Sequence, residues 1–267
     1  MLEKLSGIKN LRIEGRENLE AIATLNAQGR TVIFAPNHIA PQGTLATLRR
    51  NSAFADDFPV LNKVLEDAGI NSKIIARGDT DMEVGQSKIN KIIYNTHRRI
   101  FSALVKLITG GIPVAINARD PGYASQVNMP AVRVIFSALK NTNLTIYPYG
   151  NWFESEEQTF EENDDLQDGN FVDIKDFDQW RKSLKDGFIK IAKKSGTPII
   201  PIYVENKNGE WCIVFGKPIM PDKKSANNDL AKRYLAAMRE LKAKSAEVYK
   251  GLTKTCDDGS LSGTASS

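Results

Sequence analysis

Residues Thr31 to Thr44 read TVIFAPNHIAPQGT, and this stretch indicates both the kind of sheet and the place of a site. Its first part, Thr31–Ala35, is a short apolar run, which is typical of a strand buried on both faces. Pro36 ends the run, and Asn37 and His38 follow at once. An imidazole at such a point is held by the strand and stays accessible in the loop, so His38 is a candidate general base. The alternative is a hydrogen-bonded structural histidine.

Strand and helix patterns alternate on both sides of this stretch. Apolar residues at helical spacing predict helices, and short apolar runs predict strands. The predicted helices cover residues 17–28, 41–51, 86–107, 131–139, 180–194 and 229–249. The predicted strands cover residues 31–35, 73–76, 112–117, 144–147, 199–204 and 211–215. This alternation predicts an α/β fold with a mixed, largely parallel sheet flanked by helices.

The length and composition fit one domain of a soluble protein. The 267 residues are 41% hydrophobic and 25% charged, which is an ordinary composition and enough chain for a substantial core. We expect a single α/β domain over residues 1–250 and a disordered Ser/Thr/Gly-rich tail over residues 251–267. Residues 154–178 contain eleven Asp and Glu but only one lysine, so we expect a long acidic loop there.

The charge and the cysteines exclude several functions. The formal net charge of +4 suits anionic ligands such as phosphate esters, acidic carrier proteins or lipid headgroups, but it is too small to indicate nucleic acid. Cys212 and Cys256 are too few for a disulfide framework or a metal site, so we expect two free thiols in a reducing compartment. The N-terminus lacks the apolar core of a signal peptide. We therefore expect a cytoplasmic protein whose membrane contact, if any, is peripheral and on the inner face.

The predicted helix 86–107 carries basic and apolar residues side by side. They are Arg98, Arg99, Lys106, Ile100, Phe101 and Leu104. The pattern fits either a helix that lies on a membrane surface or a core helix with a basic outer edge. We favour the core helix, because that arrangement is the more common one.

Polar or special residues follow three predicted strands, in the loops Asn37-His38, Arg119-Asp120 and Pro148-Tyr149-Gly150. Ligands of such sheets bind at the carboxyl ends of the strands, so we expect these loops to converge on one site. The Arg119 guanidinium could hold a phosphate or carboxylate through two hydrogen bonds, and its alternative is a surface ion pair. Arg77 follows its strand in the same way.

The turn at residues 148–151 has backbone N–H groups that could hold an anion. The alternative is a tight turn without a ligand.

Taken in chain order, five segments resemble the motifs of the glycerolipid acyltransferase superfamily, which includes glycerol-3-phosphate and lysophosphatidate acyltransferases. They are Ile13–Leu19, like a Gly-x-Glu-Asn-Leu lead-in; Asn37-His38, like the start of an Asn-His-x4-Asp block; Ile116–Arg119, like a block that ends in Arg; Tyr147–Asn151, like Phe-Pro-Glu-Gly-Thr; and Lys185–Ala192 with Gly196–Ile202, like a helix that leads into Val-Pro-Ile-Val-Pro-Val. The order and spacing agree over about residues 11–220.

The resemblance implies an enzyme of phospholipid synthesis. Such an enzyme moves a fatty acyl group from the thioester of acyl-CoA or acyl carrier protein to a hydroxyl of a glycerol-phosphate or lysolipid acceptor, with no further cofactor and no metal. His38 matches the general base of the family, and Arg119 matches the residue that holds the acceptor phosphate. Tyr149, Gly150 and Asn151 match residues that line the acceptor pocket.

Three positions depart from the family pattern. Gly43 stands where the family has the Asp that orients the imidazole, Tyr149 replaces Glu, and Asn151 replaces Thr. Loss of such an Asp lowers activity by about 10⁴-fold in related base chemistry. The candidates for a replacement partner of the imidazole are Gln42, Thr44, Asp79, Asp81 and Asp120.

Two functions therefore remain open. One is an acyltransferase with His38 as its base. The other is a degenerate acyltransferase fold that binds a lipid or a phosphorylated ligand without turnover. A carboxylate within hydrogen-bond reach of one His38 ring nitrogen favours the enzyme. A ring sealed by Tyr149, or bonded only to backbone, favours the binding protein.

Overall fold

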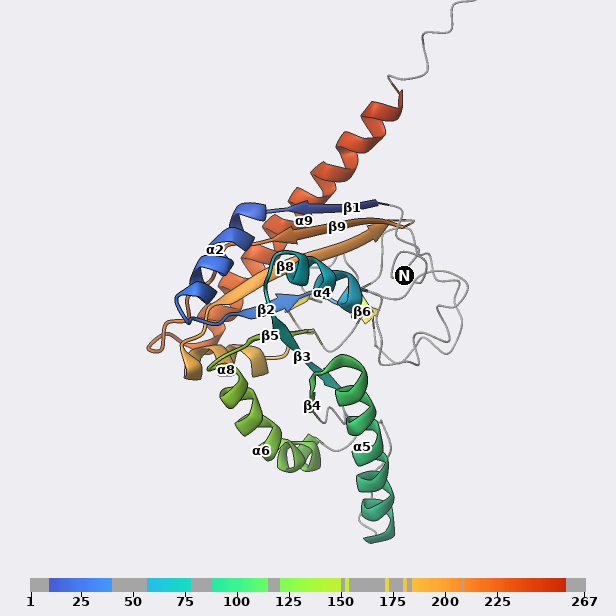
Figure 1. The fold of residues 1–267 in the computed structure, drawn as a ribbon, viewed down its shortest axis with the longest axis vertical. Helices are drawn as coiled ribbons and strands as arrows, with labels where there is room; N and C mark the ends of the chain where they lie inside the picture. The colour runs from blue at the N-terminus through green and yellow to red at the C-terminus, as the bar shows by residue number, and fades with distance from the viewer. Residues whose placement is uncertain are drawn as a thin grey trace, which may run out of the picture.

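A seven-stranded sheet forms the centre of the computed structural model (Figure 1). The structure describes residues 10–39, 57–77, 88–114, 121–149, 152–153, 171–172, 180–181, 184–207 and 209–257. The strands of the sheet are β1 (Asn10–Glu14), β2 (Ile33–Pro36), β3 (Ser72–Arg77), β4 (Ile112–Val114), β5 (Asn143–Ile146), β8 (Ile199–Lys207) and β9 (Glu210–Phe215). Their order is β1-β9-β8-β2-β5-β3-β4, and only the β8–β9 pair among them is antiparallel. The predicted mixed, largely parallel sheet is thus confirmed.

Helices pack on both faces of this sheet. They are α2 (Arg16–Ala27), α4 (Asp57–Asp67), α5 (Lys88–Thr109), α6 (Pro121–Ala138), α8 (Gly187–Ser195) and α9 (Asn227–Asp257). One apolar cluster joins α2 and α4 to the sheet, and a second joins α6, α8 and α9 to its other face. Helix α5 contacts β3 and β4 at one edge of the sheet.

The strand β2 lies in the middle of the sheet and is covered on both faces. Val32 and Phe34 belong to the cluster with α2 and α4, whereas Ile33 and Ala35 belong to the cluster with α8 and α9. All four side chains have no exposed surface. This burial is the reason that the sequence here is a continuous apolar run rather than an alternating one.

Several elements differ from the sequence prediction. Helix α4 was not predicted at all, nor was the edge strand β1. A small parallel pair joins β6 (Trp152–Phe153), which directly precedes the predicted acidic loop, to β7 (Phe171–Val172), which lies within it. Helix α9 continues to Asp257, so residues 251–257, which we placed in the tail, are helical. The predicted helix 41–51 lies outside the described residues.

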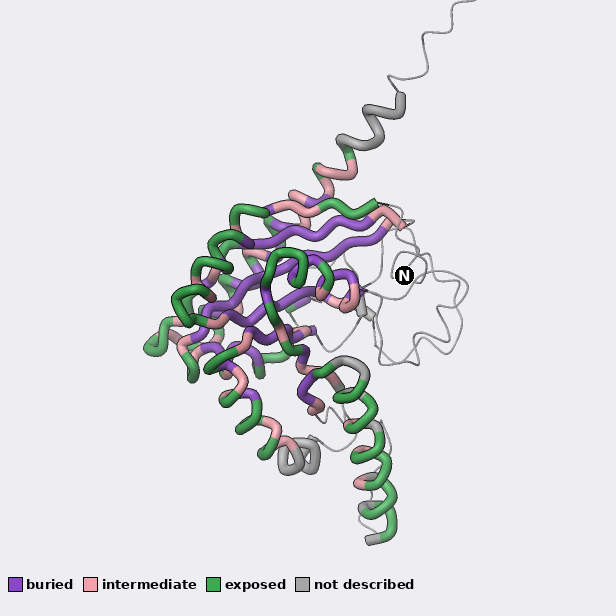
Figure 2. Tube along the Cα trace, in the orientation of Figure 1, coloured by how far each residue is buried: buried purple, intermediate pink, exposed green. Residues whose placement is uncertain are grey.

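Helix α5 is not the core helix that we favoured. Its apolar residues Ile100 and Leu104 are 59% and 47% exposed, and Leu107 is 81% exposed. In Figure 2 the part of this helix that projects from the body is largely exposed. No helix within the described ranges is both long and apolar enough to cross a membrane.

Cys212 lies on β9 and has no exposed surface. Burial raises the pKa of its thiol, so less of the reactive thiolate is present at a given pH. In a Cys256→Ser background, we expect Cys212 to react with Ellman's reagent about 100-fold more slowly in the native protein than in the urea-unfolded protein, because reaction requires opening of the sheet. Equal rates would contradict the buried position of Cys212.

Candidate active site

The loop that carries His38 is tied to the neighbouring strand by the side chain of Asn37. The Asn37 Nδ2 group donates to the Val204 carbonyl at 2.8 Å, and the Asn37 Oδ1 atom accepts from the Val204 N–H at 2.7 Å. Asn37 is fully buried. The Asn37 side chain thus makes the two hydrogen bonds that a backbone residue of a neighbouring strand would make with Val204. This fixes the point at which His38 leaves the sheet.

Replacing Asn37 by alanine is expected to lower the free energy of unfolding by about 3 kcal/mol, because both backbone groups of Val204 would lose a buried partner. Urea unfolding followed by circular dichroism measures this change. Asn26→Ala is the matched control. Within the described part of the chain, the Asn26 side chain donates to the carbonyl of Ile22 in its own helix, and we expect a change below about 0.5 kcal/mol. Equal losses in the two variants would refute the role given to Asn37.

His38 forms a pair with a carboxylate that comes from α4. The His38 Nδ1 and Asp57 Oδ2 atoms are 2.8 Å apart, and the same Oδ2 atom accepts the Ile39 N–H at 3.1 Å. Asp57 is fully buried, while the His38 side chain is 22% exposed. Two donors therefore converge on one carboxylate oxygen, and this fixes the imidazole relative to the backbone.

Asp57 lies at the N-terminus of a helix. Asp57 is the first residue of α4, and the positive end of a helix dipole stabilises a negative charge there. A charged Asp57 accepts the proton on Nδ1 of the neutral ring, which leaves Nε2 as the basic nitrogen. This arrangement of histidine and carboxylate is the one used by general bases.

Tyr147 packs against the other side of the same imidazole. The centroids of the two rings are 4.5 Å apart, with an angle of 48° between the planes. Burial, and secondly the charge of Asp57, raise the pKa of the Tyr147 hydroxyl far above its ordinary value. Among the described residues, neither the Tyr147 Oη nor the Asp57 Oδ1 has a hydrogen-bond partner. The tyrosine ring thus restricts the imidazole by contact rather than through its hydroxyl.

Tyr147→Phe is therefore expected to leave the free energy of unfolding unchanged or to raise it by up to about 1 kcal/mol, since a buried hydroxyl without a partner costs desolvation energy. Urea unfolding again provides the measurement. A loss of more than about 1 kcal/mol would mean that the hydroxyl has a partner outside the described ranges.

Tyr149 lies in the core rather than at an open surface. Its side chain is 1% exposed, and its ring contacts those of Trp180 and Tyr234. The turn that it occupies is bonded to the segment before α8. Tyr149 and Leu184 form an isolated antiparallel β-bridge, and the Lys185 N–H donates to the Pro148 carbonyl at 2.8 Å. The Tyr149 side chain, which the family resemblance places at the acceptor pocket, thus packs among buried aromatic rings. Tyr149 does not seal the His38 ring from solvent either, since that ring is partly exposed.

The neighbouring parallel strands β2 and β5 end close together. His38 follows β2 and Tyr147 follows β5, and these two side chains are in contact. Arg77 is the last residue of the adjacent parallel strand β3, so its backbone lies at the same edge. Arg119, Gly150 and Asn151 lie outside the described residues, as do Gly43 and the alternative partners Gln42, Thr44, Asp79, Asp81 and Asp120.

Sequence reasoning missed Asp57, which lies 19 residues after His38. A signal was present in the apolar spacing of Phe58, Leu61, Val64 and Leu65, which is helical and follows Asp57 directly. The described residues include no group of three or more His, Cys, Asp or Glu that could hold a metal ion.

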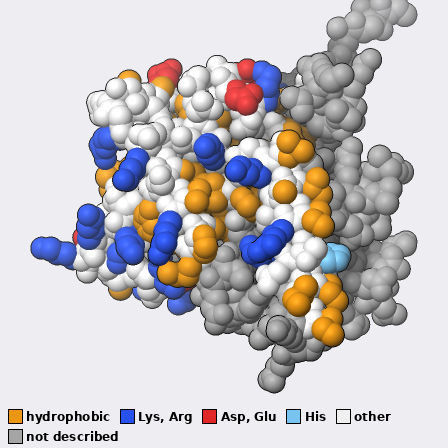
Figure 3. Space-filling view, turned by 60° about the horizontal axis from the view of Figure 1, so that its bottom comes forward, with side chains coloured by type: hydrophobic (Ala, Val, Ile, Leu, Met, Phe, Trp, Pro, Cys, Tyr) orange, Lys and Arg blue, Asp and Glu red, His pale blue; other side chains and the backbone are white. Residues whose placement is uncertain are grey.

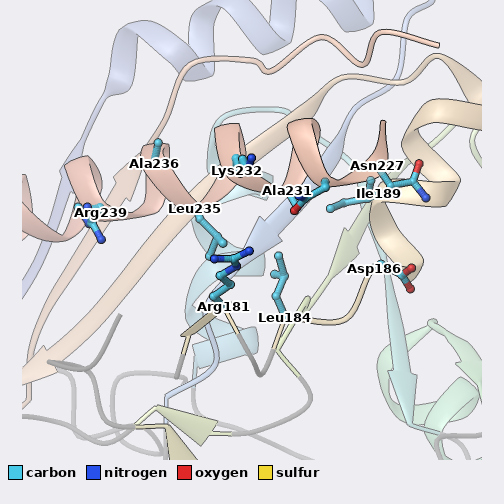
Figure 4. Close-up of a pocket in the computed structure, with 11 residues that line it drawn as sticks. Arg181, Leu184, Asp186, Ile189, Asn227, Ala231, Lys232, Leu235, Ala236 and Arg239 are labelled. Carbon is cyan, nitrogen blue, oxygen red and sulfur yellow. The ribbon is translucent and has the colours of Figure 1, made fainter. Parts of the chain in front are cut away.

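A separate hollow of about 580 Å³ lies between α8 and α9 (Figure 4). Arg181 and Leu184 line one side of it, and Leu235 and Arg239 of α9 line the other. It belongs to the face of the sheet that α8 and α9 cover, whereas α4, which carries Asp57, packs on the other face. None of His38, Asp57 and Tyr147 lines it, so it is not the place where the imidazole acts.

No known family model matches the chain, and no curated protein matches it either. Among solved structures, the chain is similar to the 1-acyl-sn-glycerophosphate (LPA) acyltransferase PlsC from Thermotoga maritima. The two share 14% sequence identity over 91% of this chain and 79% of that one, with a TM-score of 0.40. A likeness this distant does not assign the chain to a family, so its function must be inferred from the site itself.

Proposed function

We propose that the chain is an acyltransferase that moves an acyl group from a thioester to a hydroxyl, with His38 as general base and Asp57 as the carboxylate that orients it. The observation that carries this proposal is the 2.8 Å contact between His38 Nδ1 and Asp57 Oδ2, at the carboxyl end of a buried central strand. The motif order in the sequence supports the reaction class. Gly43 stands where the family motif has its carboxylate, and Asp57 contacts the imidazole in its place.

In the proposed reaction, the Nε2 atom of His38 takes the proton of the acceptor hydroxyl. The hydroxyl oxygen then forms a bond to the thioester carbonyl carbon, and a tetrahedral intermediate results. When this intermediate collapses, the carbon–sulfur bond breaks, and the departing sulfur receives the proton from the imidazolium. The products are an ester and a free thiol, and His38 is neutral again.

Asp57 orients the imidazole throughout this cycle. Its charge stabilises the imidazolium that forms in the first step, and its contact with the Ile39 N–H keeps the carboxylate in place. Tyr147 limits rotation of the ring, since its aromatic face contacts His38. The chain thus supplies a base, the group that orients it and a ring that restricts its motion.

The acceptor in this proposal is a glycerol phosphate or a lysolipid, and the donor is acyl-CoA or acyl carrier protein. Arg119, Gly150 and Asn151 would hold the acceptor phosphate, with Arg77 as a further candidate at the same edge of the sheet. Guanidinium groups and turn N–H groups suit a phosphate. This part of the proposal is supported by the motif resemblance and by the convergence of the strand ends. The proposed setting is the cytoplasm, as a step of phospholipid synthesis.

A transfer assay with the purified full-length chain tests the proposal. Radiolabelled acyl-CoA and acyl carrier protein are offered separately, each with glycerol 3-phosphate and with lysophosphatidate, and the lipid products are separated by thin-layer chromatography. We expect labelled ester to exceed the amount of protein, which shows multiple turnovers. Binding of an acceptor without any ester would overturn the proposal in favour of a binding protein. Free fatty acid as the main product would show that water is the acceptor.

A further inference from the structure

Helix α5 carries an exposed apolar stripe along most of its length. The stripe consists of Ile89, Ile92, Ile93, Ile100, Leu104 and Leu107, which are 68%, 58%, 41%, 59%, 47% and 81% exposed. Their spacing places all six within a third of the helix circumference, because residues three, four, seven and eleven apart lie on one face. Between Ile89 and Leu107 the stripe is roughly 27 Å long at 1.5 Å per residue.

An exposed apolar surface of this kind is uncommon on a protein that remains in water. Contiguous patches of large apolar side chains usually mark a contact with another molecule or with a membrane. Helix α5 projects from the edge of the sheet, at the same end of the molecule as α6 (Figure 1). The stripe therefore lies on a protruding element that a flat surface can reach.

The charges of α5 and α6 indicate what kind of surface the stripe contacts. Together α5 and α6 contain six Lys and Arg and no Asp or Glu, although the whole chain has 32 acidic residues. Arg99 and Lys106 are exposed and flank one side of the α5 stripe. Figure 3 shows a face on which hydrophobic side chains are mixed with lysines and arginines, with few acidic groups.

From this combination we infer that α5 docks on an anionic lipid bilayer, with the stripe inserted among the acyl chains and its basic flank at the headgroups. Long basic side chains can keep their charge at the headgroup level while their stems lie along the apolar surface. Apolar insertion and electrostatic attraction then add, as they do for helices that lie in a membrane interface. This inference does not depend on the proposed acyl transfer, because it uses no residue of the His38 site.

Vesicle co-sedimentation of the full-length chain tests the inference. The probes are vesicles of phosphatidylcholine alone and vesicles that also contain phosphatidylglycerol. We expect binding to the anionic vesicles to be on the order of tenfold stronger, and to weaken as salt is raised. Absence of binding to anionic vesicles would overturn the inference, as would equal binding to both kinds.

Two double variants separate the apolar from the charged contribution. Ile100→Glu with Leu107→Glu is expected to lower the partition coefficient on anionic vesicles by at least about tenfold, because two inserted side chains become charged. Arg99→Gln with Lys106→Gln is expected to remove most of the preference for anionic lipid. Glutamate and glutamine are good helix formers, so α5 should persist, and circular dichroism checks this.

The matched controls are exposed residues elsewhere. Met220→Glu changes an apolar side chain that is 45% exposed and lies outside α5, and Lys140→Gln with Lys185→Gln removes two exposed charges outside the helix. Neither control should alter vesicle binding by more than about twofold. A second copy of the chain is the competing occupant. A dimer in sedimentation velocity that Ile100→Glu with Leu107→Glu converts to a monomer would refute the lipid assignment.

Discussion

Acyl transfer by a His38→Ala variant is expected to fall by about 10²–10⁴-fold in kcat, with little change in the affinity for either substrate. The imidazole is the group that takes the proton of the acceptor hydroxyl, and alanine leaves no base in its place. The remaining activity would come from the positioning of the two substrates alone. Single-turnover kinetics with labelled thioester measure the chemical step directly.

The other histidine of the chain provides the control for this experiment. His97 lies on α5 and is exposed, and α5 packs on β3 and β4 at one edge of the sheet. With soluble acceptor and donor, His97→Ala should retain full activity. If the two alanine variants had similar rates, His38 would not be the base, and the reaction would have to use another group.

Asp57→Asn is expected to lower kcat by about 10³–10⁴-fold, while the protein stays folded. The asparagine oxygen can accept the same two hydrogen bonds, from His38 Nδ1 and from the Ile39 N–H, so the geometry can persist. The negative charge is lost, however, and with it the stabilisation of the imidazolium in the transition state. A change of this size corresponds to about 4–5 kcal/mol of transition-state stabilisation.

The matched control is on the same helix. Asp67 is the last residue of α4, its side chain is 64% exposed, and it pairs with Lys63 one turn earlier. Asp67→Asn should change neither kcat nor KM, since an exposed pair of this kind contributes little. Activity of Asp57→Asn within tenfold of the parent would mean that Asp57 holds the loop but does not assist the base.

Much of the sheet could be predicted from the sequence because its central strands are buried on both faces. Burial of this kind forces continuous apolar runs such as Thr31–Ala35, and the turn residues around them mark the ends. Gly29 lies just beyond the end of α2 and has a φ of 71°, a left-handed conformation that commonly ends helices. Strand β1 was missed although polar and apolar residues alternate over Asn10–Glu14, because it is only five residues long and has only two apolar positions.

The site could be predicted only in part, and the reason is the distance along the chain between its two central groups. His38 follows a strong strand signal, so its place at the sheet edge was foreseen. Asp57 begins a helix, but the next residues, Phe58 and Pro59, show no helical periodicity by themselves. The helix is predicted only when the apolar residues further along, such as Leu61 and Val64, are included. The family motif has its carboxylate at the position of Gly43. In the structure, the hydrogen bond to His38 is made instead by Asp57, which lies 19 residues after His38.

The separate anchoring of His38 and Asp57 has a consequence for how this protein can change over evolution. His38 is positioned by β2 and Asn37, and Asp57 is the first residue of α4. The imidazole–carboxylate distance therefore depends on how α4 packs against the sheet. A substitution in the apolar interface between α4 and the sheet can shift the carboxylate relative to the imidazole, because packed interiors transmit such changes. Selection on the site therefore also acts on this interface, whose residues do not themselves touch a substrate.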